Sequence, residues 1–542
     1  RDLADNLQTR GSRLLVRQCE RPAEALAAII AEAAAGDVFR GVEFFTHAEF
    51  CTEELAAERA ARSALAAAAA RCDFPLRFTT LWGGLTVHHI DDLGFDIHEP
   101  GAMPQFKGEF NKLAKRRPIR PTLPVPNKLK PPPSSPACLG AEVGACEVAA
   151  AFMAYDRMIA GDASLRELYG LGDAACGTLE APTPPLLPEP PTEAVVRAGY
   201  GTCFRDGSFA WVGGESAAQE YLAEYFTPPQ GRSGKGGKGG KGGGVAGAVT
   251  EDIARRNLWT YRGATESFAH GEETNPIFAG SRLSPWLAFG CISAREVVLR
   301  SKEAERAHGR KGGGKSAEKA GSTGARLHTE LLFRDFLRVS ALVWGSRLFR
   351  QEGPFDVRGI PWRGLLEVGG GGEVPPAVLH RLWLRGRTGF PFVDAGMRQL
   401  TRTGYMSHLH RQCCGAFLAR DLHLDWRLGA EAFEACLVDY TPDANWGNWA
   451  YRILQRPGLA QSRASVRYDS GELRRLGLPP STAGQLAVDV HANTVECLAW
   501  PIVHDCRLQH SLTWLPELRS LPADLAREPW RLLEAHESTG GP

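Results

Sequence analysis

Residues 387–451 read RTGFPFVDAGMRQLTRTGYMSHLHRQCCGAFLARDLHLDWRLGAEAFEACLVDYTPDANWGNWAY. Their apolar side chains recur every three or four residues, the spacing that gives a helix one buried face. The same spacing runs through most of residues 201–459, so we predict an all-α domain of five or more helices there. The predicted helices fall at 216–226, 285–307, 329–349, 392–405, 410–422 and 430–440.

The end of this stretch, DYTPDANWGNWAY (439–451), combines aromatic side chains with the breakers Pro442 and Gly447. Its composition alone favours a buried, loop-rich piece of core, because a Trp is most often a packing residue. An indole can also donate an electron to a strongly oxidising excited cofactor. The amide of Asn445 can donate and accept a hydrogen bond, although it cannot deliver a proton. Both interpretations stay open on the residues alone.

Residues 1–127 alternate strand and helix patterns instead. Short apolar runs at 12–19, 38–47 and 74–83 read as strands, and Ala-rich helical segments lie between them. This alternation predicts parallel βαβ units and an α/β, Rossmann-like sheet. No GxGxxG follows a strand, which argues against a dinucleotide fingerprint.

The remaining segments are of low complexity or unclear structure. Residues 128–200 are rich in proline and are predicted to be a long extended linker. Gly- and Lys-rich inserts are predicted to be surface loops at 231–247, 308–324 and 368–373. Residues 460–542 form a C-terminal segment whose structure the pattern does not define.

Composition excludes several classes of protein. Apolar residues make up 43% and charged residues 23% of the 542 residues, which is typical of a soluble protein, and no run is apolar enough to span a bilayer. The 13 cysteines form no CxxC pair, so neither a zinc site nor a disulfide framework is predicted. The net charge is +1, yet residues 381–411 hold many arginines against the single acid Asp394. That segment is either a surface for anions or a solvated helical face.

The motif GSRLSPWLAFG (280–290) suggests a phosphate site. Ser284 suits a helix N-cap and Pro285 suits the first helical turn. Ser281 and Arg282 then lie beside the free N–H groups of a helix N-terminus, which favours phosphate or pyrophosphate. A plain capped helix is the alternative.

Charged pairs in apolar surroundings are further candidates. Glu330 and Arg334 lie one helical turn apart in ELLFRDF, among apolar neighbours. Asp439 lies among aromatic residues, where a carboxylate needs a partner, and we expect Arg411 to supply it.

Together these motifs resemble the photolyase/cryptochrome flavoproteins, and within them the DASH-type cryptochromes. The resemblance is long and collinear, strongest over 200–451 and weaker over 1–127. It is carried by GGESAAQEYLAEYF (213–226), GSRLSPWLAFGCIS (280–293), ELLFRDFLR (330–338), residues 387–451 and WLPELRSLPADLAREPW (514–530). It implies an N-terminal α/β antenna domain at 1–127, which lacks the family's opening strands, and a helical FAD-binding domain at 201–459.

The resemblance also implies roles for individual residues. Ser281, Arg282, Leu283 and Ser284 should hold the FAD phosphates. The flavin pocket should be lined by Tyr261, Glu330, Arg334, His408, Arg411, Asp439, Thr441 and Asn445. Asn445 should face the flavin N5, where an amide favours the reduced flavin that donates an electron to damaged DNA. Trp449, Trp426 and Trp362 match the tryptophans that pass electrons to photoexcited flavin.

At the DNA lesion, the resemblance implies Phe333, Gln412 and Tyr451 as pocket walls and Glu330 as a hydrogen-bond partner of the dimer. The arginines of 381–411 should then face DNA phosphates. This chain differs from the family at four positions in or beside these two sites. Phe333 replaces a Trp, His408 replaces an Asn, Leu409 replaces an Arg and Thr441 replaces an Asp. An imidazole at position 408 can donate a hydrogen bond, accept one or titrate near neutral pH.

Three hypotheses follow. The first is a blue-light-driven FAD lyase, a photolyase-like monomer that repairs cyclobutane pyrimidine dimers, mainly in single-stranded DNA. The second is a blue-light photoreceptor that signals through a partner without repair. The third is a truncated gene product that folds poorly. A folate antenna, methenyltetrahydrofolate, is the second pigment that the resemblance implies, with Glu109 as a candidate contact. We expect an intracellular protein; the missing N-terminus leaves chloroplast, mitochondrion and nucleus equally open.

Overall fold

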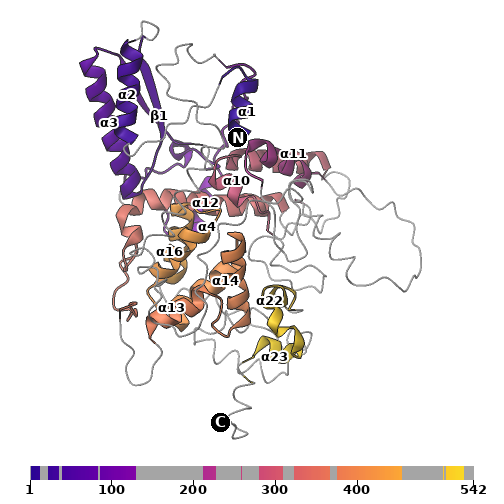
Figure 1. The fold of residues 1–542 in the computed structure, drawn as a ribbon. Coiled ribbons are helices and arrows are strands. Elements are labelled where there is room, and N and C mark those ends of the chain that lie inside the picture. Colours follow the sequence, from indigo (N-terminus) through magenta and orange to yellow (C-terminus); the bar gives the residue numbers. More distant parts are fainter. Residues whose placement is uncertain are drawn as a thin grey trace, which may run out of the picture.

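The computed structural model describes residues 2–12, 22–35, 40–83, 86–99, 101–129, 212–227, 258, 280–308, 323–366, 375–454, 505, 508–529 and 531. Almost all of the linker predicted at 128–200, and of the predicted inserts, lies outside these residues. Figure 1 shows an N-terminal α/β unit at one end of the described chain and a larger helical part beside it.

The N-terminal unit contains a parallel βαβ crossover. Strands β1 (Val42–His47) and β2 (Leu76–Leu81) pair in parallel, with Val42 opposite Leu76 and His47 opposite Leu81. Helix α3 (Thr52–Arg71) connects them, and α2 (Pro22–Ala35) packs against α3 through Ile30 (Figure 1). The predicted crossover is therefore confirmed for these two strands, while most of the strand predicted at 12–19 lies outside the described residues.

The helical part follows the predicted periodicity. Its helices are α4 (Lys107–Ala114), α8 (Glu215–Tyr225), α10 (Ser284–Ala288), α11 (Ala294–His308), α12 (Thr323–Trp344), α13 (Pro376–Leu384), α14 (Pro391–Thr403), α15 (His408–Ala416), α16 (Trp426–Cys436), α17 (Pro442–Trp449), α22 (Gln509–Trp514) and α23 (Ala523–Arg527), and α1 (Asp2–Thr9) opens the chain. Single π-helical turns follow α15 (Phe417–Asp421) and α17 (Ala450–Leu454). In the described part of the chain, no helix is long and apolar enough to cross a membrane.

The structure differs from the sequence pattern in three places. Residues 285–307 form two helices, because the chain turns after α10 through Gly290, whose φ of 68° is left-handed. Residues 442–451 are helical: α17 begins at Pro442, whose missing N–H costs nothing in the first turn, and a π-helical turn follows it. Helix α13 was not predicted at all, although it also begins with a proline.

Helix α12 joins the N-terminal residues to the helical part. Its buried Asp335 accepts hydrogen bonds from the backbone N–H groups of Val87, at 2.9 and 3.0 Å, and of His88, at 3.2 Å. Burial raises the pKa of Asp335 to about 7. One turn later, Arg338 donates to the carbonyl of Ala48 at 2.9 Å and pairs with Glu49 at 3.1 Å. Two polar anchors therefore hold the N-terminal residues against α12.

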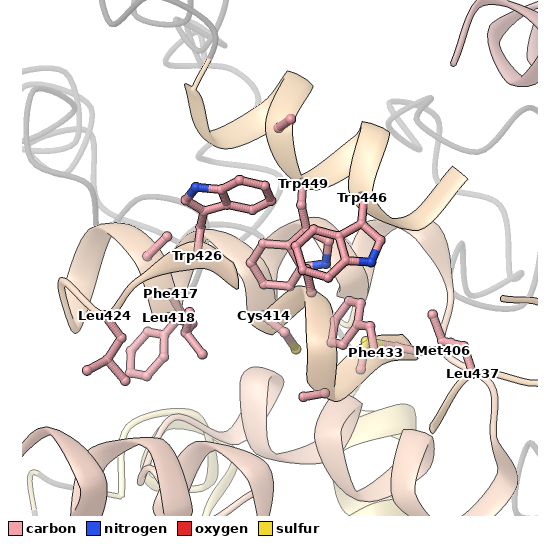
Figure 2. Close-up of a cluster of buried hydrophobic side chains, with 14 of the residues drawn as sticks. Met406, Cys414, Phe417, Leu418, Leu424, Trp426, Phe433, Leu437, Trp446 and Trp449 are labelled. Carbon is pink, nitrogen blue, oxygen red and sulfur yellow. The ribbon is translucent and has the colours of Figure 1, made fainter. Parts of the chain in front are cut away.

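Two hydrophobic cores meet at the end of α17. Trp449, with Trp426 and Trp446, belongs to one core, whose members come mostly from α14 to α17 (Figure 2). Tyr451, two residues later, belongs to the other core, with Phe333 and the rest of α12. The end of α17 and the π-helical turn after it therefore present Trp449 and Tyr451 to different cores of the helical part.

The C-terminal helices pack onto α14 (Figure 1). The buried carboxylate of Asp505 accepts hydrogen bonds from the backbone N–H groups of His510 and Ser511 and so fixes the start of α22. The His510 ring lies 4.3 Å from the His410 ring, centroid to centroid. Glu517 pairs with Arg398 of α14 at 2.6 Å.

Candidate functional site

A buried ion pair lies at the centre of the site. Arg411 of α15 donates to Asp439 at 2.8 Å, and the Asp439 side chain is only 3% exposed. Arg411 also donates to the carbonyl of Met406 at 2.8 Å, which fixes the guanidinium. The partner predicted for Asp439 is confirmed.

The Tyr405 ring contacts both this ion pair and the GSRL segment (residues 280–283). The Arg411 guanidinium lies 5.4 Å from the centroid of the Tyr405 ring, and that of Arg282 lies 5.1 Å from the same centroid. Two cations thus gather on one aromatic ring, a cation–π arrangement. Sequence reasoning missed Tyr405, because nothing in its own neighbourhood distinguishes it from a core aromatic.

The GSRL segment is tightly held but not capped as predicted. The Ser281 carbonyl accepts a hydrogen bond from the Tyr221 hydroxyl at 2.9 Å, and Arg282 and Leu283 are buried. Arg282 has a left-handed φ of 54°. The prediction that Ser284 is the N-cap is wrong: Leu283 occupies the cap position, no side chain caps the helix, and α10 has five residues.

Helix α12 contributes Glu330, Phe333 and Arg334. Arg334 donates to the carbonyl of Leu287 at 3.2 Å and so connects α12 to α10, and burial lowers the pKa of its guanidinium. Glu330 is half-buried one turn earlier. The structure thus places Arg334 against the segment that follows Ser281–Ser284.

Helix α17 holds Asn445 in the interior. Asn445 is 7% exposed, and its Nδ2 donates to the carbonyl of Ala430 on α16 at 2.8 Å. Asp443, on the same helix, lies 3.7 Å from Arg338. The amide is therefore fixed by a neighbouring helix through its N–H, and its Oδ1 is by chemistry an acceptor.

Trp449 lies between two glycines. A Cβ at Gly415 would come within 3.2 Å of the Trp449 ring, and one at Gly429 would overlap it. The Trp449 ring also meets Phe433 edge-on, with centroids 5.2 Å apart. These glycines, which sequence reasoning did not single out, let helices α15 and α16 approach the indole closely.

The other two predicted tryptophans lie further along the same core. Trp426 is fully buried, and its Nε1 donates to the carbonyl of Gln351 at 3.0 Å. Trp362 is half-buried and packs on the edge of this core. The next residue, Arg363, pairs with the backbone of residues 423–425, which brings Trp362 towards the start of α16.

An aromatic wall lies on the other side of α17. The rings of Phe333 and Phe336 each pack edge to face against the Tyr451 ring, with ring centroids 5.7 Å apart in both pairs. The Lys107 ammonium of α4 lies 4.8 Å from the centroid of the Phe333 ring. The predicted lesion residues Phe333 and Tyr451 are thus in contact with each other.

His408 and Gln412 lie one turn apart on α15 and are joined by a hydrogen bond between His408 Nε2 and Gln412 Nε2. Burial, together with the charges of Arg452, Arg411 and Lys107, lowers the pKa of His408 to about 3. Of the three roles open to this imidazole, the structure favours hydrogen bonding over titration near neutral pH, because a neutral ring is more stable in this interior.

The arginines of 381–411 do not form a single surface. Arg398 is held by Glu517 and by the carbonyls of Gly386 and Trp514, and Arg411 by Asp439. Both guanidinium groups therefore have partners within the protein. Arg387 and Arg402 are exposed.

Several buried polar atoms at the site fit a bound cofactor. Asp439 Oδ1, Thr441 Oγ1 and Tyr451 Oη are buried without a hydrogen-bond partner among the described residues. Buried polar groups are almost always satisfied, so these atoms fit a ligand that offers both donors and acceptors, as a flavin does. Tyr261, also predicted for this pocket, lies outside the described residues.

Comparison with known proteins agrees with this geometry. Residues 327–456 match the model of the FAD-binding domain of DNA photolyase. A Cryptochrome DASH of Synechocystis sp. is 31% identical over 300 residues, which cover 54% of this chain and 50% of the relative. The chain thus spans half the length of that relative. A chloroplastic/mitochondrial Cryptochrome DASH of Arabidopsis thaliana is 28% identical over 98% of this chain and 67% of its own length.

Solved structures show the same fold. The crystal structure of a Synechocystis sp. cryptochrome aligns over the whole chain and 81% of its own length, with a TM-score of 0.58 and 25% identity. A bacterial class III photolyase of Agrobacterium tumefaciens aligns with a TM-score of 0.56 at 20% identity, a likeness of fold alone. The chain is therefore similar to photolyases and cryptochromes, with DASH-type cryptochromes among the proteins it resembles, and FAD is the cofactor that this similarity indicates.

Proposed function

We propose that this protein is a blue-light-driven, DASH-type flavoprotein that repairs cyclobutane pyrimidine dimers, mainly in single-stranded DNA. The observation that carries the proposal is the end of α17, which faces two ways. Trp449 packs in a core that is rich in tryptophan. Tyr451, in the turn that follows, packs against the aromatic wall, and buried polar atoms without a hydrogen-bond partner among the described residues lie at the site. Electron supply and lesion binding can thus take place on opposite sides of one short helix.

The flavin pocket would be formed by residues of α10, α12, α15 and α17. Arg411 and Asp439 would orient the ring system, and the Oδ1 of Asn445 would meet its N5. Residues Ser281–Ser284 would hold the phosphates, with Arg282 supplying the charge. FAD, when bound, supplies the absorption of blue light and, in its reduced form, the electron that splits the dimer.

The lesion would bind against Phe333 and Tyr451. Both rings are almost fully buried in this structure, so the wall would have to open before they stack on a flipped base. Stacking would then suit any base, since every base has a π face. Glu330 lies one turn from Phe333 on α12 and would hydrogen-bond the dimer. Gln412, held by His408, would face the same pocket.

The N-terminal α/β unit would serve as an antenna domain. A surface depression of about 470 Å³ lies beside α4 and is lined by Glu109, Lys112 and Arg116, among others. A folate such as methenyltetrahydrofolate carries carboxylates and a polar ring, so basic and acidic side chains together suit it. We propose that the folate antenna binds in this depression and contacts Glu109.

A photoreceptor that signals through a partner is the second candidate. It is favoured by the position of Lys107, whose ammonium covers the Phe333 ring that a lesion would need. The two candidates differ in one respect, because only a repair enzyme needs the aromatic wall to open to DNA.

The test is dimer repair in single-stranded oligonucleotide by the protein with reduced flavin under blue light. We expect loss of dimers in light and none in darkness, with slower repair in duplex DNA because base flipping costs more there. Lys107→Ala should leave repair intact or improve it if Lys107 only covers the pocket. If illuminated, flavin-loaded protein leaves the dimers unchanged and still shows a light-dependent conformational change, the photoreceptor is the better description.

A further inference from the structure

Trp446 is a buried tryptophan that neither the predicted electron route nor the lesion pocket uses. Its ring meets the Trp426 ring edge-on, with the centroids 5.7 Å apart. Figure 2 shows both indoles in the same buried cluster. The side chain is 6% exposed and lies on α17, three residues before Trp449. An electron can therefore pass directly from one ring to the other.

The indole N–H of Trp446 has a specific acceptor. Trp446 Nε1 donates to the Glu434 carboxylate at 2.8 Å, across from α17 to α16. Glu434 is an exposed residue, so water reaches its carboxylate. By contrast, Trp426 Nε1 donates to a backbone carbonyl, which cannot take up a proton.

Tyr440 reinforces this arrangement. It is half-buried beside Glu434 and Trp446, and burial, aided by the Glu434 charge, raises its pKa well above the ordinary value. Tyr440 therefore stays protonated, and the Glu434 carboxylate is the oxygen that the Trp446 N–H contacts.

An oxidised tryptophan loses its N–H proton far more readily than a neutral one. When the proton leaves, the radical becomes neutral, and return of the electron then requires a proton as well. A carboxylate hydrogen-bonded to one particular indole thus decides which tryptophan keeps the radical.

We infer that Trp446 is a terminal electron donor, a branch from Trp426, and that Glu434 accepts its indole proton. One electron passes from Trp446 to the Trp426 radical cation, which returns to neutral Trp426. The N–H proton moves to the Glu434 carboxylate, leaving a neutral Trp446 radical and a protonated Glu434. The oxidant is the photoexcited, oxidised flavin acting through Trp449 and Trp426, so the inference rests on the proposed electron route.

Three substitutions test the branch by time-resolved absorption and electron paramagnetic resonance after a blue flash on protein with oxidised FAD. Trp446→Phe keeps an aromatic ring but removes the donor, and we expect loss of the long-lived neutral tryptophan radical. Glu434→Gln keeps an acceptor oxygen but removes the base, and we expect the cation form in place of the neutral radical. Glu431→Gln, an exposed change on the same helix, should behave as the wild type.

A further readout needs no flavin. In the apoprotein, the Trp446 indole N–H band, assigned by ultraviolet resonance Raman difference against Trp446→Phe, should shift in Glu434→Gln and stay in place in Glu431→Gln. This reports the hydrogen bond itself and shows that each variant is folded around it.

The outcomes separate this inference from the proposed function. An unchanged yield and lifetime of the neutral radical in Trp446→Phe, or its loss in Trp362→Phe, overturns the branch while the electron route stands. A neutral radical formed normally in Glu434→Gln overturns the role of Glu434. If the wild type forms no tryptophan radical, or Trp449→Phe still forms it, the proposed route fails and the branch with it.

Discussion

The Trp449 indole lies so close to the backbone of Gly429 that a methyl group at position 429 would overlap the ring. Gly415 approaches the same ring from α15, so the indole is confined between two helices. This confinement explains why glycine occurs inside α16, where it is otherwise a poor helix former.

Gly429→Ala should destabilise the protein by about 1–3 kcal/mol, the usual cost of overpacking a core, and should slow flavin photoreduction by displacing Trp449. Urea unfolding and the rate of photoreduction measure the two effects. Gly108→Ala is the matched control, because Gly108 is a helical glycine with open space around its Cβ position. That variant should be neutral or slightly more stable. Equal costs at the two positions would contradict the close packing.

The ion pair between Arg411 and Asp439 should be important for stability. Arg411→Ala leaves the buried Asp439 carboxylate without its partner, which costs about 3–5 kcal/mol when a buried pair is broken. Arg358→Ala breaks a pair with Asp356 whose side chains are 77% and 70% exposed, so its cost should stay within about 0.2–1 kcal/mol. Chemical denaturation of both variants, with flavin absorbance as a second readout, provides the comparison. Similar losses in both would show that the buried pair is unimportant.

His510 should make stability depend on pH. Burial and the charge of Arg282 lower its pKa to about 3 from an ordinary 6.5, so the folded protein binds fewer protons than the unfolded chain between these values. Its contribution is therefore full above pH 6.5 and is lost as the pH falls towards 3, by at most about 1.4 kcal/mol per pH unit. His510→Phe keeps the ring contact with His410 and should flatten this dependence, measured as urea midpoints from pH 7 to pH 4. The same acid slope in both proteins would count against a buried, neutral His510.

The exposed arginines should bind DNA, and Arg398 should not. Each of Arg387→Ala and Arg402→Ala should weaken binding of single-stranded DNA and reduce its salt dependence by about 0.7 in slope. Arg398→Ala breaks the contact with Glu517 and should lower stability instead. Fluorescence anisotropy at several salt concentrations, with melting curves of each variant, distinguishes these effects. A salt slope reduced only in Arg398→Ala would reverse the assignment.

Much of the fold follows from local patterns. The three- and four-residue spacing of apolar side chains located the helices of 392–405 and 430–440, and alternation located β1 and β2. The partner of Asp439 was predictable because a carboxylate among aromatic residues needs a cation.

Other features depend on contacts distant in sequence. The Tyr405 ring belongs to the site because it contacts Arg282, which lies more than a hundred residues earlier in the chain. Gly429 matters because the Trp449 ring packs directly against its backbone. The burial that keeps His408 neutral, and the contact that commits Arg398 to Glu517, exist only once the helices pack. No local spacing encodes them.

The most direct test is the absorption spectrum of the purified, folded protein before and during blue illumination, for the wild type and for Trp449→Phe. We predict that both carry bound flavin, that light reduces it in the wild type, and that reduction is much slower in Trp449→Phe. Folded protein without a flavin band, or equal photoreduction in the two proteins, would contradict the account.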